Sequence, residues 1–126
     1  MKNQRQQTGR RGEDEACRFL LECGHQILER NFRISHLETD IISLDKDGVH
    51  FVEVKTRRVP ASADPEENVG PVKQRRLVGA AQEYLHSSMK MIPPDAEVFF
   101  DVITVLLDGD DSYIEYYPQA FIPVYV

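Results

Sequence analysis

The sequence predicts a single α/β domain in which helices flank a mixed β-sheet. Apolar residues recur at helical spacing in two segments, whereas β-branched or alternating runs fill five others. The resulting order is helix, three strands, helix and two strands, which suits a mixed sheet with helices packed on it. The chain has 126 residues, of which 41% are hydrophobic. This is enough for one core and excludes a disordered chain.

The first helix is expected over residues 8–23, with Thr8 as its N-cap and Gly24 as its C-cap. Residues 1–7 before it are expected to form a flexible tail. The helix should bury a stripe at helical spacing, made of Gly12, Ala16, Phe19, Leu20 and Cys23. Cys17 and Cys23 are too far apart along the axis to form a disulfide, so we expect free, buried thiols.

Three strands follow over residues 25–33, 39–44 and 49–56. The dipeptide Asp47-Gly48 between the last two indicates a tight hairpin, because both residues tolerate positive φ. A two-residue loop leaves two registers open, with either Lys46 paired to Val49 or Asp45 paired to Gly48.

Residues 59–70 contain prolines and acidic residues and are expected to form a surface loop. The second helix should begin at Pro71 and end near Met89. Its core stripe should contain Leu77, Ala80, Ala81, Tyr84 and Leu85. Residues 98–106 read as a central, nearly all-apolar strand, and residues 112–117 as the last strand.

Three charged residues occupy the otherwise apolar hairpin: Asp40 on its first strand, and Glu53 and Lys55 on its second. Side chains alternate along a strand, so Glu53 and Lys55 share a face, whereas His50 points away from it. Asp40 lies beside Lys55 in one hairpin register and beside Glu53 in the other. Both registers gather two carboxylates and an amine.

One interpretation of this cluster is a cross-strand ion pair, worth only ~0.2–1 kcal/mol. The other is a divalent-cation site, since unpaired buried charge is costly and Mg²⁺ is typically held by one or two carboxylates plus substrate phosphates. A lysine beside such a site can orient or deprotonate a water molecule and stabilise charge on a phosphate. The residues alone leave both interpretations open.

Asp40 followed on the next strand by Glu53-Val-Lys55 resembles the PD-(D/E)xK nuclease superfamily. Further motifs make the chain similar to the YraN family of small bacterial proteins: Gly9-x-x-Gly12-Glu13-x-x-Ala16, Asn31-Phe-Arg33, Glu38-x-Asp40, Phe51-Val-Glu-Val-Lys-Thr-Arg57, Val69-x-x-x-Lys73-Gln-Arg-Arg76 and Phe100-Asp-Val102. The resemblance spans about residues 9–121 and implies the restriction-endonuclease-like fold. Two positions depart from the family pattern, Leu37 in place of a glycine and Phe99 in place of an arginine.

The resemblance implies a nuclease that uses Mg²⁺ or Mn²⁺, with Asp40, Glu53, Lys55, Glu13 and Lys73 as catalytic residues. Asp40, Glu53 and Glu13 would hold the metal. Without the resemblance, Glu13 would be an ordinary first-turn acid favoured by the helix dipole. Lys73 would be a lysine whose stem covers apolar surface at the edge of the second helix.

The net charge of −6 is unevenly distributed. Residues 1–89 carry 14 basic and 14 acidic residues, whereas residues 90–126 carry one lysine and seven acids. A phosphate group interacts with the charges near it, so the negative net charge of the whole chain does not exclude nucleic-acid binding. Arg57, Arg58, Arg75 and Arg76 are the candidate nucleic-acid-binding residues, and a solvated basic surface is the alternative.

Three functions compete: a nuclease acting on DNA, structured or branched DNA included; a nucleic-acid-binding module of the same fold with little or no cleavage; and a protein that docks an acidic partner. The combination of both carboxylates with Lys55 favours the first, because binding alone needs only cations. No apolar run is long enough to span a membrane, and the N-terminus lacks the apolar core of a secretory signal. With the free thiols, this predicts a cytoplasmic protein without a membrane partner. A homodimer is a candidate assembly.

Overall fold

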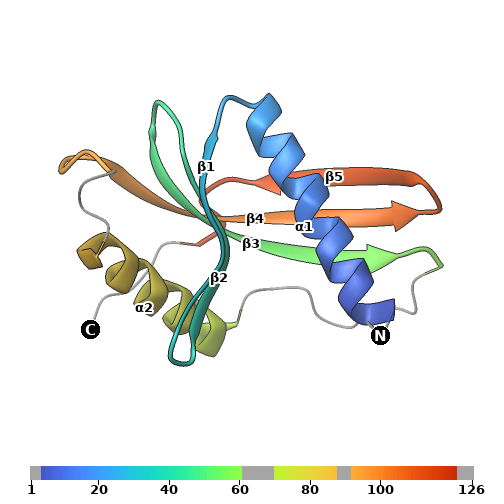
Figure 1. The fold of residues 1–126 in the computed structure, drawn as a ribbon, viewed down its shortest axis with the longest axis horizontal. Coiled ribbons are helices and arrows are strands. Elements are labelled where there is room, and N and C mark those ends of the chain that lie inside the picture. Colours follow the sequence, from blue (N-terminus) through green and yellow to red (C-terminus); the bar gives the residue numbers. More distant parts are fainter. Residues whose placement is uncertain (1–3, 61–69, 88–91, 122–126) are drawn as a thin grey trace.

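Five strands form one sheet in the computed structural model, which describes residues 4–60, 70–87 and 92–121 (Figure 1). The elements are α1 (Gln4–Glu22), β1 (Gln26–Ile34), β2 (Leu37–Leu44), β3 (Gly48–Arg58), α2 (Pro71–Ser87), β4 (Glu97–Asp108) and β5 (Asp111–Tyr117). The strand order follows the sequence, and every neighbouring pair is antiparallel except β3 and β4, which are parallel. This mixed sheet with two helices confirms the predicted α/β class.

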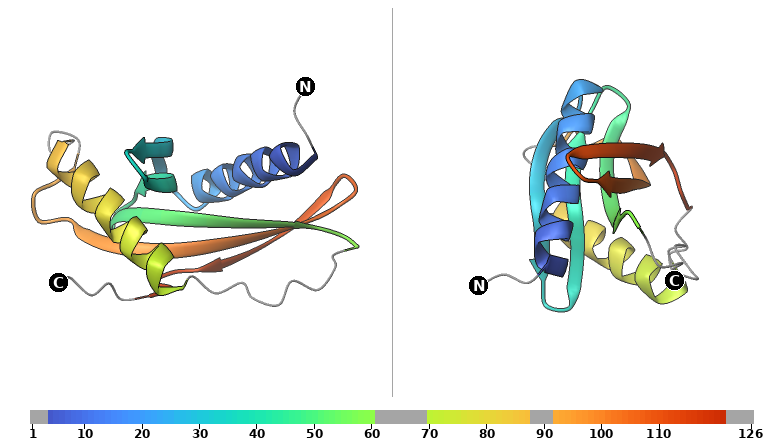
Figure 2. Two further views of the ribbon diagram at one scale, coloured as in Figure 1. Left: turned by 90° about the horizontal axis from the view of Figure 1, so that it is seen from below. Right: turned by 90° about the vertical axis from the view of Figure 1, so that its right-hand side faces the viewer.

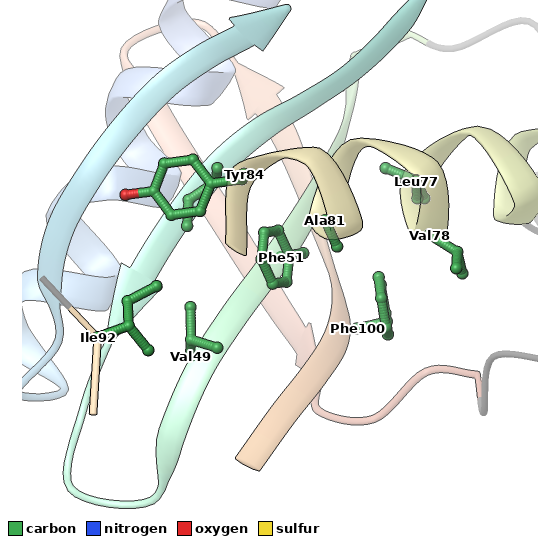
Figure 3. Packing of buried hydrophobic residues seen from close by; sticks show 9 residues of the cluster. Val49, Phe51, Leu77, Val78, Ala81, Tyr84, Ile92 and Phe100 are labelled. Atoms are coloured by element: carbon green, nitrogen blue, oxygen red, sulfur yellow. The ribbon is translucent and has the colours of Figure 1, made fainter. Parts of the chain in front are cut away.

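The two helices build separate cores on the two faces of the sheet, and they lie well apart in Figure 1 and Figure 2. Helix α1 buries Ala16 and Leu20 against a cluster that includes Val52 of β3. Helix α2 buries Tyr84 against a second cluster that includes Phe51 of β3 (Figure 3). Because adjacent residues of a strand point to opposite faces, Phe51 and Val52 identify the α2 side and the α1 side of the sheet.

Helix α1 is longer than predicted. It begins at Gln4, so residues 4–7, predicted as part of a flexible tail, are helical, and Thr8 lies inside the helix rather than at its N-cap. The Thr8 hydroxyl accepts a hydrogen bond from Arg58 Nε at 2.5 Å. Arg11 Nη1 donates to the Gly109 carbonyl oxygen at 2.7 Å. Contacts with β3 and with the β4–β5 turn therefore hold this part of the helix.

The C-terminal end of α1 follows the prediction. Gly24 adopts φ 92° directly after the helix, and the N–H of His25 donates to the Leu20 carbonyl oxygen at 2.9 Å. This is the geometry of a glycine C-cap. Cys17 is a buried free thiol, but Cys23 is exposed, so the prediction of burial was wrong for Cys23. The last turn of the helix rotates it away from the sheet.

Helix α2 begins at Pro71 as predicted and is described to Ser87; the predicted end near Met89 lies outside the described residues, as does most of the predicted surface loop. Strand β4 lies between β3 and β5, so β3 rather than β4 occupies the middle of the sheet. Within the described ranges, no helix is long and apolar enough to cross a membrane.

The β2–β3 hairpin adopts the register in which Asp45 pairs with Gly48. Asp45 N donates to the Gly48 carbonyl oxygen at 3.0 Å, which leaves a two-residue loop. Gly48 has φ 155°, and a Cβ at this position would lie 2.3 Å from the Glu97 carbonyl oxygen, so a side chain does not fit. The paired residues run only from Leu44–Val49 to Ile41–Val52, although both strands continue. The two strands therefore separate beyond Ile41.

Candidate functional site

A pair of carboxyl groups lies where β2 and β3 separate. In the observed register Asp40 is opposite Glu53, and both side chains lie on the α2 side of the sheet, as do Ile42 and Phe51. Asp40 Oδ2 accepts a hydrogen bond from Val54 N at 2.8 Å, just beyond the last paired residues. Glu53 is only 4% exposed. The Asp40 carboxylate thus replaces the backbone of β2 as the partner of β3.

Burial and the neighbouring Glu53 perturb the carboxyl group of Asp40. Burial raises the pKa of Asp40, and the hydrogen bond and charge of Glu53 add to this effect, bringing it to about 9. The bond from Val54 acts in the opposite sense without cancelling the shift. In the absence of a cation, Asp40 therefore holds its proton at neutral pH. Such perturbed carboxyl pairs are concentrated at functional sites.

Lys73 approaches this pair from α2. Its Nζ lies 2.6 Å from Oε2 of Glu53. Among the described residues, Glu53 Oε2 has no hydrogen-bond partner of suitable geometry. The contact with Lys73 is therefore described as an ion pair. Burial lowers the pKa of Lys73, but the bond to Glu53 and the nearby carboxylates outweigh it, and the net shift is upward. The Lys73 side chain is 45% exposed, so its cationic end contacts Glu53 while the rest of the side chain reaches solvent.

Glu13 approaches from the other helix. Gly12, the residue before it, packs so closely on β3 that an added Cβ would lie 1.9 Å from Thr56 Oγ1. This close approach places Glu13 near the separated strands. Burial raises the pKa of Glu13, while a hydrogen bond with the Asn31 side chain and the charge of Arg30 oppose the shift.

Asn31 is a site residue that the sequence reasoning did not single out. It adopts φ 53°, a left-handed conformation that asparagine tolerates better than most residues. This conformation accompanies its bond to Glu13. The available signal was the Asn31-Phe-Arg33 motif, to which the sequence analysis gave no role at the site.

One pocket of about 770 Å³ brings most of these groups together. Its lining includes the acids Glu13, Asp40 and Glu53, the cations Arg5, Arg57, Arg58 and Lys73, and Thr8 and Gly9 of α1. Arg5 and Thr8 were missed because the helix was predicted to begin too late. The lining combines three carboxyl groups, of which that of Glu53 is buried, with four cationic side chains, a combination suited to a cation and a phosphate.

Three predicted site residues lie outside this lining. Lys55 shares a face of β3 with Glu53 but does not line the pocket, and its side chain is half-buried. Arg75 and Arg76 are exposed on α2 and do not line the pocket either. The structure thus gathers Glu13, Asp40, Glu53 and Lys73 around one pocket whose lining does not include Lys55.

The fold is also found in a solved structure, that of the Holliday junction resolvase Hjc from Archaeoglobus fulgidus. The two superpose with a TM-score of 0.50 at 17% sequence identity, covering 86% of this chain and 75% of that chain. This likeness shows the fold, which is restriction-endonuclease-like, as the motifs predicted.

Sequence comparison identifies closer relatives. A UPF0102 protein from Syntrophotalea carbinolica is 43% identical over 122 residues, covering 96% of each chain. Another, from Anaeromyxobacter dehalogenans, is 38% identical over 119 residues, covering 93% of this chain and 85% of the relative. The model of the uncharacterised protein family UPF0102 matches residues 12–105. The resemblance to the YraN family is thereby confirmed: the chain belongs to the uncharacterised protein family UPF0102 and has a nuclease-like fold.

Proposed function

We propose that this protein is a nuclease that uses Mg²⁺ or Mn²⁺ to hydrolyse phosphodiester bonds in DNA, structured or branched DNA included. The observation that supports this most is that the half-buried Asp40 and the buried Glu53 line one pocket together with three arginines. A solved protein of the same fold is a Holliday junction resolvase, which makes four-way DNA a substrate to test.

The donor set fits a hard divalent cation. Such cations prefer carboxylate oxygens, and Mg²⁺ in particular uses few protein ligands and keeps several waters. A bound cation would displace the proton that Asp40 holds at neutral pH. In the proposal Asp40 and Glu53 hold the ion and Glu13 assists. A bound divalent cation supplies an acidified water and neutralises charge on the phosphate.

The two lysines have different proposed roles. Lys73 holds Glu53 in place and stabilises negative charge on the phosphate, because its ammonium group already lies at the carboxyl pair. Lys55 lies two residues from Glu53, about 7 Å along the strand, and a lysine side chain can span that distance. It is proposed to orient or deprotonate the attacking water.

The arginines are proposed to bind the DNA backbone. Arg57 and Arg58 line the pocket, so they should contact phosphates next to the cleaved bond. Arg75 and Arg76 would contact more distant phosphates. Each lost phosphate contact lowers the slope of log affinity against log salt by about 0.9. Replacing Arg57 and Arg58 together by alanine should reduce affinity and slope more than replacing Arg75 and Arg76. Equal binding by wild type and both double variants would show that these arginines are only a solvated surface.

The decisive experiment compares the wild type with Asp40→Asn on linear, nicked, flapped and four-way DNA, with Mg²⁺ or Mn²⁺. Asparagine keeps the size and can still accept the Val54 N–H bond, but it cannot gain the charge that Asp40 gains when a cation displaces its proton. Cleavage should be lost. DNA binding in chelator should be unchanged, because Asp40 is already uncharged there at neutral pH. Asp47→Asn, in the exposed hairpin loop, is the matched control and should cleave normally.

A second set tests the lysines. Lys55→Ala and Lys73→Ala should each reduce cleavage and weaken binding, whereas Lys46→Ala, at a position 86% exposed in the hairpin loop, should do neither. Cleavage that persists unchanged in Asp40→Asn contradicts the proposal. Binding by the wild type without cleavage of any substrate would favour the binding module instead.

The proposal includes a homodimer, because cutting two strands of a branched DNA together requires two active sites. Light scattering of the wild-type protein, alone and with four-way DNA, should give the mass of two chains per DNA. A single chain per DNA would contradict this part of the proposal and leave the cleavage reaction to be judged separately.

A further inference from the structure

A second cluster of polar side chains lies at the closed end of the β2–β3 hairpin, on the α1 side of the sheet. It contains His25, Asp45 and His50, whose side chains are 4%, 15% and 7% exposed. His50 and Glu53 are three residues apart on β3, which separates them by about 10 Å and places them on opposite faces. The cluster is therefore distinct from the carboxyl site.

Each member comes from a different element and is held in place by the backbone. His25 directly precedes β1, and His50 lies on β3. Asp45 begins the hairpin loop, where its Oδ1 accepts hydrogen bonds from the N–H groups of Asp47 and Gly48 at 2.9 and 3.1 Å. The loop thereby fixes the carboxylate before any ligand binds.

The three side chains converge on one point. His50 Nε2 lies 2.9 Å from Asp45 Oδ1, and His25 Nε2 lies 3.4 Å from Asp45 Oδ2. One ligand atom from each residue falls within 4.8 Å of the others. Nitrogen and oxygen ligands about 2.0–2.2 Å from a tetrahedral zinc ion are separated by about 3.3 Å, so small adjustments would admit the ion.

The other nitrogen of each imidazole ring is also engaged. Nδ1 of His25 lies 2.9 Å from Ser43 Oγ, and Nδ1 of His50 lies 2.6 Å from Asp101 Oδ2. Asp101 is itself held by the Tyr116 hydroxyl at 2.5 Å and by Gln119 N at 2.9 Å. Metal-binding histidines usually donate their second N–H to such an acceptor, which fixes the ring orientation and leaves Nε2 for the metal.

We propose that His25, Asp45 and His50 bind one transition-metal ion of the zinc class. Two imidazoles with one carboxylate suit Zn²⁺, Co²⁺ or Ni²⁺, whereas Mg²⁺ prefers an all-oxygen set. A water molecule would complete the tetrahedron from the side of Asp45, the most exposed of the three. The ion would join the start of β1 to the hairpin loop and to β3, and so stabilise this end of the sheet. This proposal does not depend on the nuclease activity.

The test uses the full-length chain without an affinity tag, stripped of metal by a chelator. Titration with Zn²⁺ should give one ion per chain and a higher melting temperature, and Co²⁺ should give the visible absorption of a tetrahedral site. Excess Mg²⁺ should not displace either ion. His25→Gln should weaken Zn²⁺ binding by more than the 10–100-fold that loss of an outer partner costs, and Ser43→Ala by about 10-fold.

Asp45→Asn provides a second ligand variant, and thermal unfolding without metal verifies that each variant folds. The matched control replaces the two exposed histidines, His36 and His86, with glutamine and should bind Zn²⁺ like the wild type. Asp40→Asn should also bind normally, which separates this site from the carboxyl pair. No stoichiometric binding by the wild type would overturn the proposal, and a proton on His50 between two carboxylates would then explain the cluster. A loss of Zn²⁺ binding in the His36/His86 control as large as in the ligand variants would overturn the proposal as well.

Discussion

Gly12→Ala tests whether the contact between α1 and β3 positions the site. In this contact an added Cβ would lie 1.9 Å from Thr56 Oγ1, 2.6 Å from its Cγ2 and 2.7 Å from its Cβ. Rotating the Thr56 side chain cannot relieve the clash, because its Cβ does not move on rotation. The helix must therefore withdraw by about 0.7 Å to reach the roughly 3.4 Å of an ordinary contact.

Two effects of opposite sign set the magnitude. Alanine in place of glycine inside a helix stabilises by about 0.5–1 kcal/mol. Forcing an additional methyl group into a packed contact costs about 1–3 kcal/mol. Gly9→Ala is the matched control, because it lies in the same helix with no atom within 4 Å of its added Cβ. The two variants should therefore differ in unfolding free energy by roughly 1–3 kcal/mol, with Gly9→Ala the more stable.

Urea unfolding at one temperature measures this difference, and a cleavage assay shows its consequence for the site. Gly12→Ala should cleave more slowly, because the withdrawn helix carries Glu13 away from the carboxyl pair. Equal stability of Gly12→Ala and Gly9→Ala would refute the argument that close packing requires glycine here. Lower stability with unchanged cleavage would show that the position of Glu13 does not matter for the reaction.

Asp40→Asn should alter the pH dependence of stability in chelator. The folded protein holds the Asp40 proton up to about pH 9, whereas the unfolded chain releases it near pH 4. The contribution of Asp40 to the unfolding free energy therefore falls as pH rises from about 4 to about 9. The melting temperatures of variant and wild type should thus diverge with rising pH, in favour of the variant; parallel curves would contradict the assigned pKa. Asp101→Asn should lower the unfolding free energy by about 3–5 kcal/mol, because its carboxylate accepts three hydrogen bonds at 0% exposure. Tyr116→Phe, which removes one of these bonds, should cost about 1 kcal/mol; urea unfolding measures both, and equal losses would contradict the network.

Local patterns were sufficient for most of the fold. The helical stripe predicted α1 and α2, and alternation predicted which residues of β3 share a face. Parity alone could not choose between the two hairpin registers. The choice depends on the Asp45 side chain, which binds the loop backbone, and on the close approach of Gly48 to Glu97. The second of these joins residues 49 positions apart and is invisible to local pattern.

The candidate site was only partly predictable for the same reason. The motifs assigned roles to Asp40, Glu53 and Lys73, but they gave none to Asn31, which contacts Glu13 of α1. The start of α1 was misplaced because its first turns depend on contacts with distant residues, such as the bond from Arg58 to Thr8. The alternation of β3 correctly placed His50 away from the carboxyl pair, although its partner Asp101 is 51 residues away in sequence.

The bond from Val54 to Asp40 has a consequence for the evolution of this fold. Asp40 takes the place of a main-chain partner at the fork of two strands, so loss of its side chain would leave a backbone N–H without that acceptor. Selection for folding alone would therefore preserve an acceptor here in a descendant that no longer cut any substrate. The side chain of Lys55 makes no hydrogen bond or ion pair within the described part of the chain, so hydrogen bonding gives no reason to keep a lysine there. Under the role proposed for Lys55, the lysine is thus the better record of retained activity across a lineage.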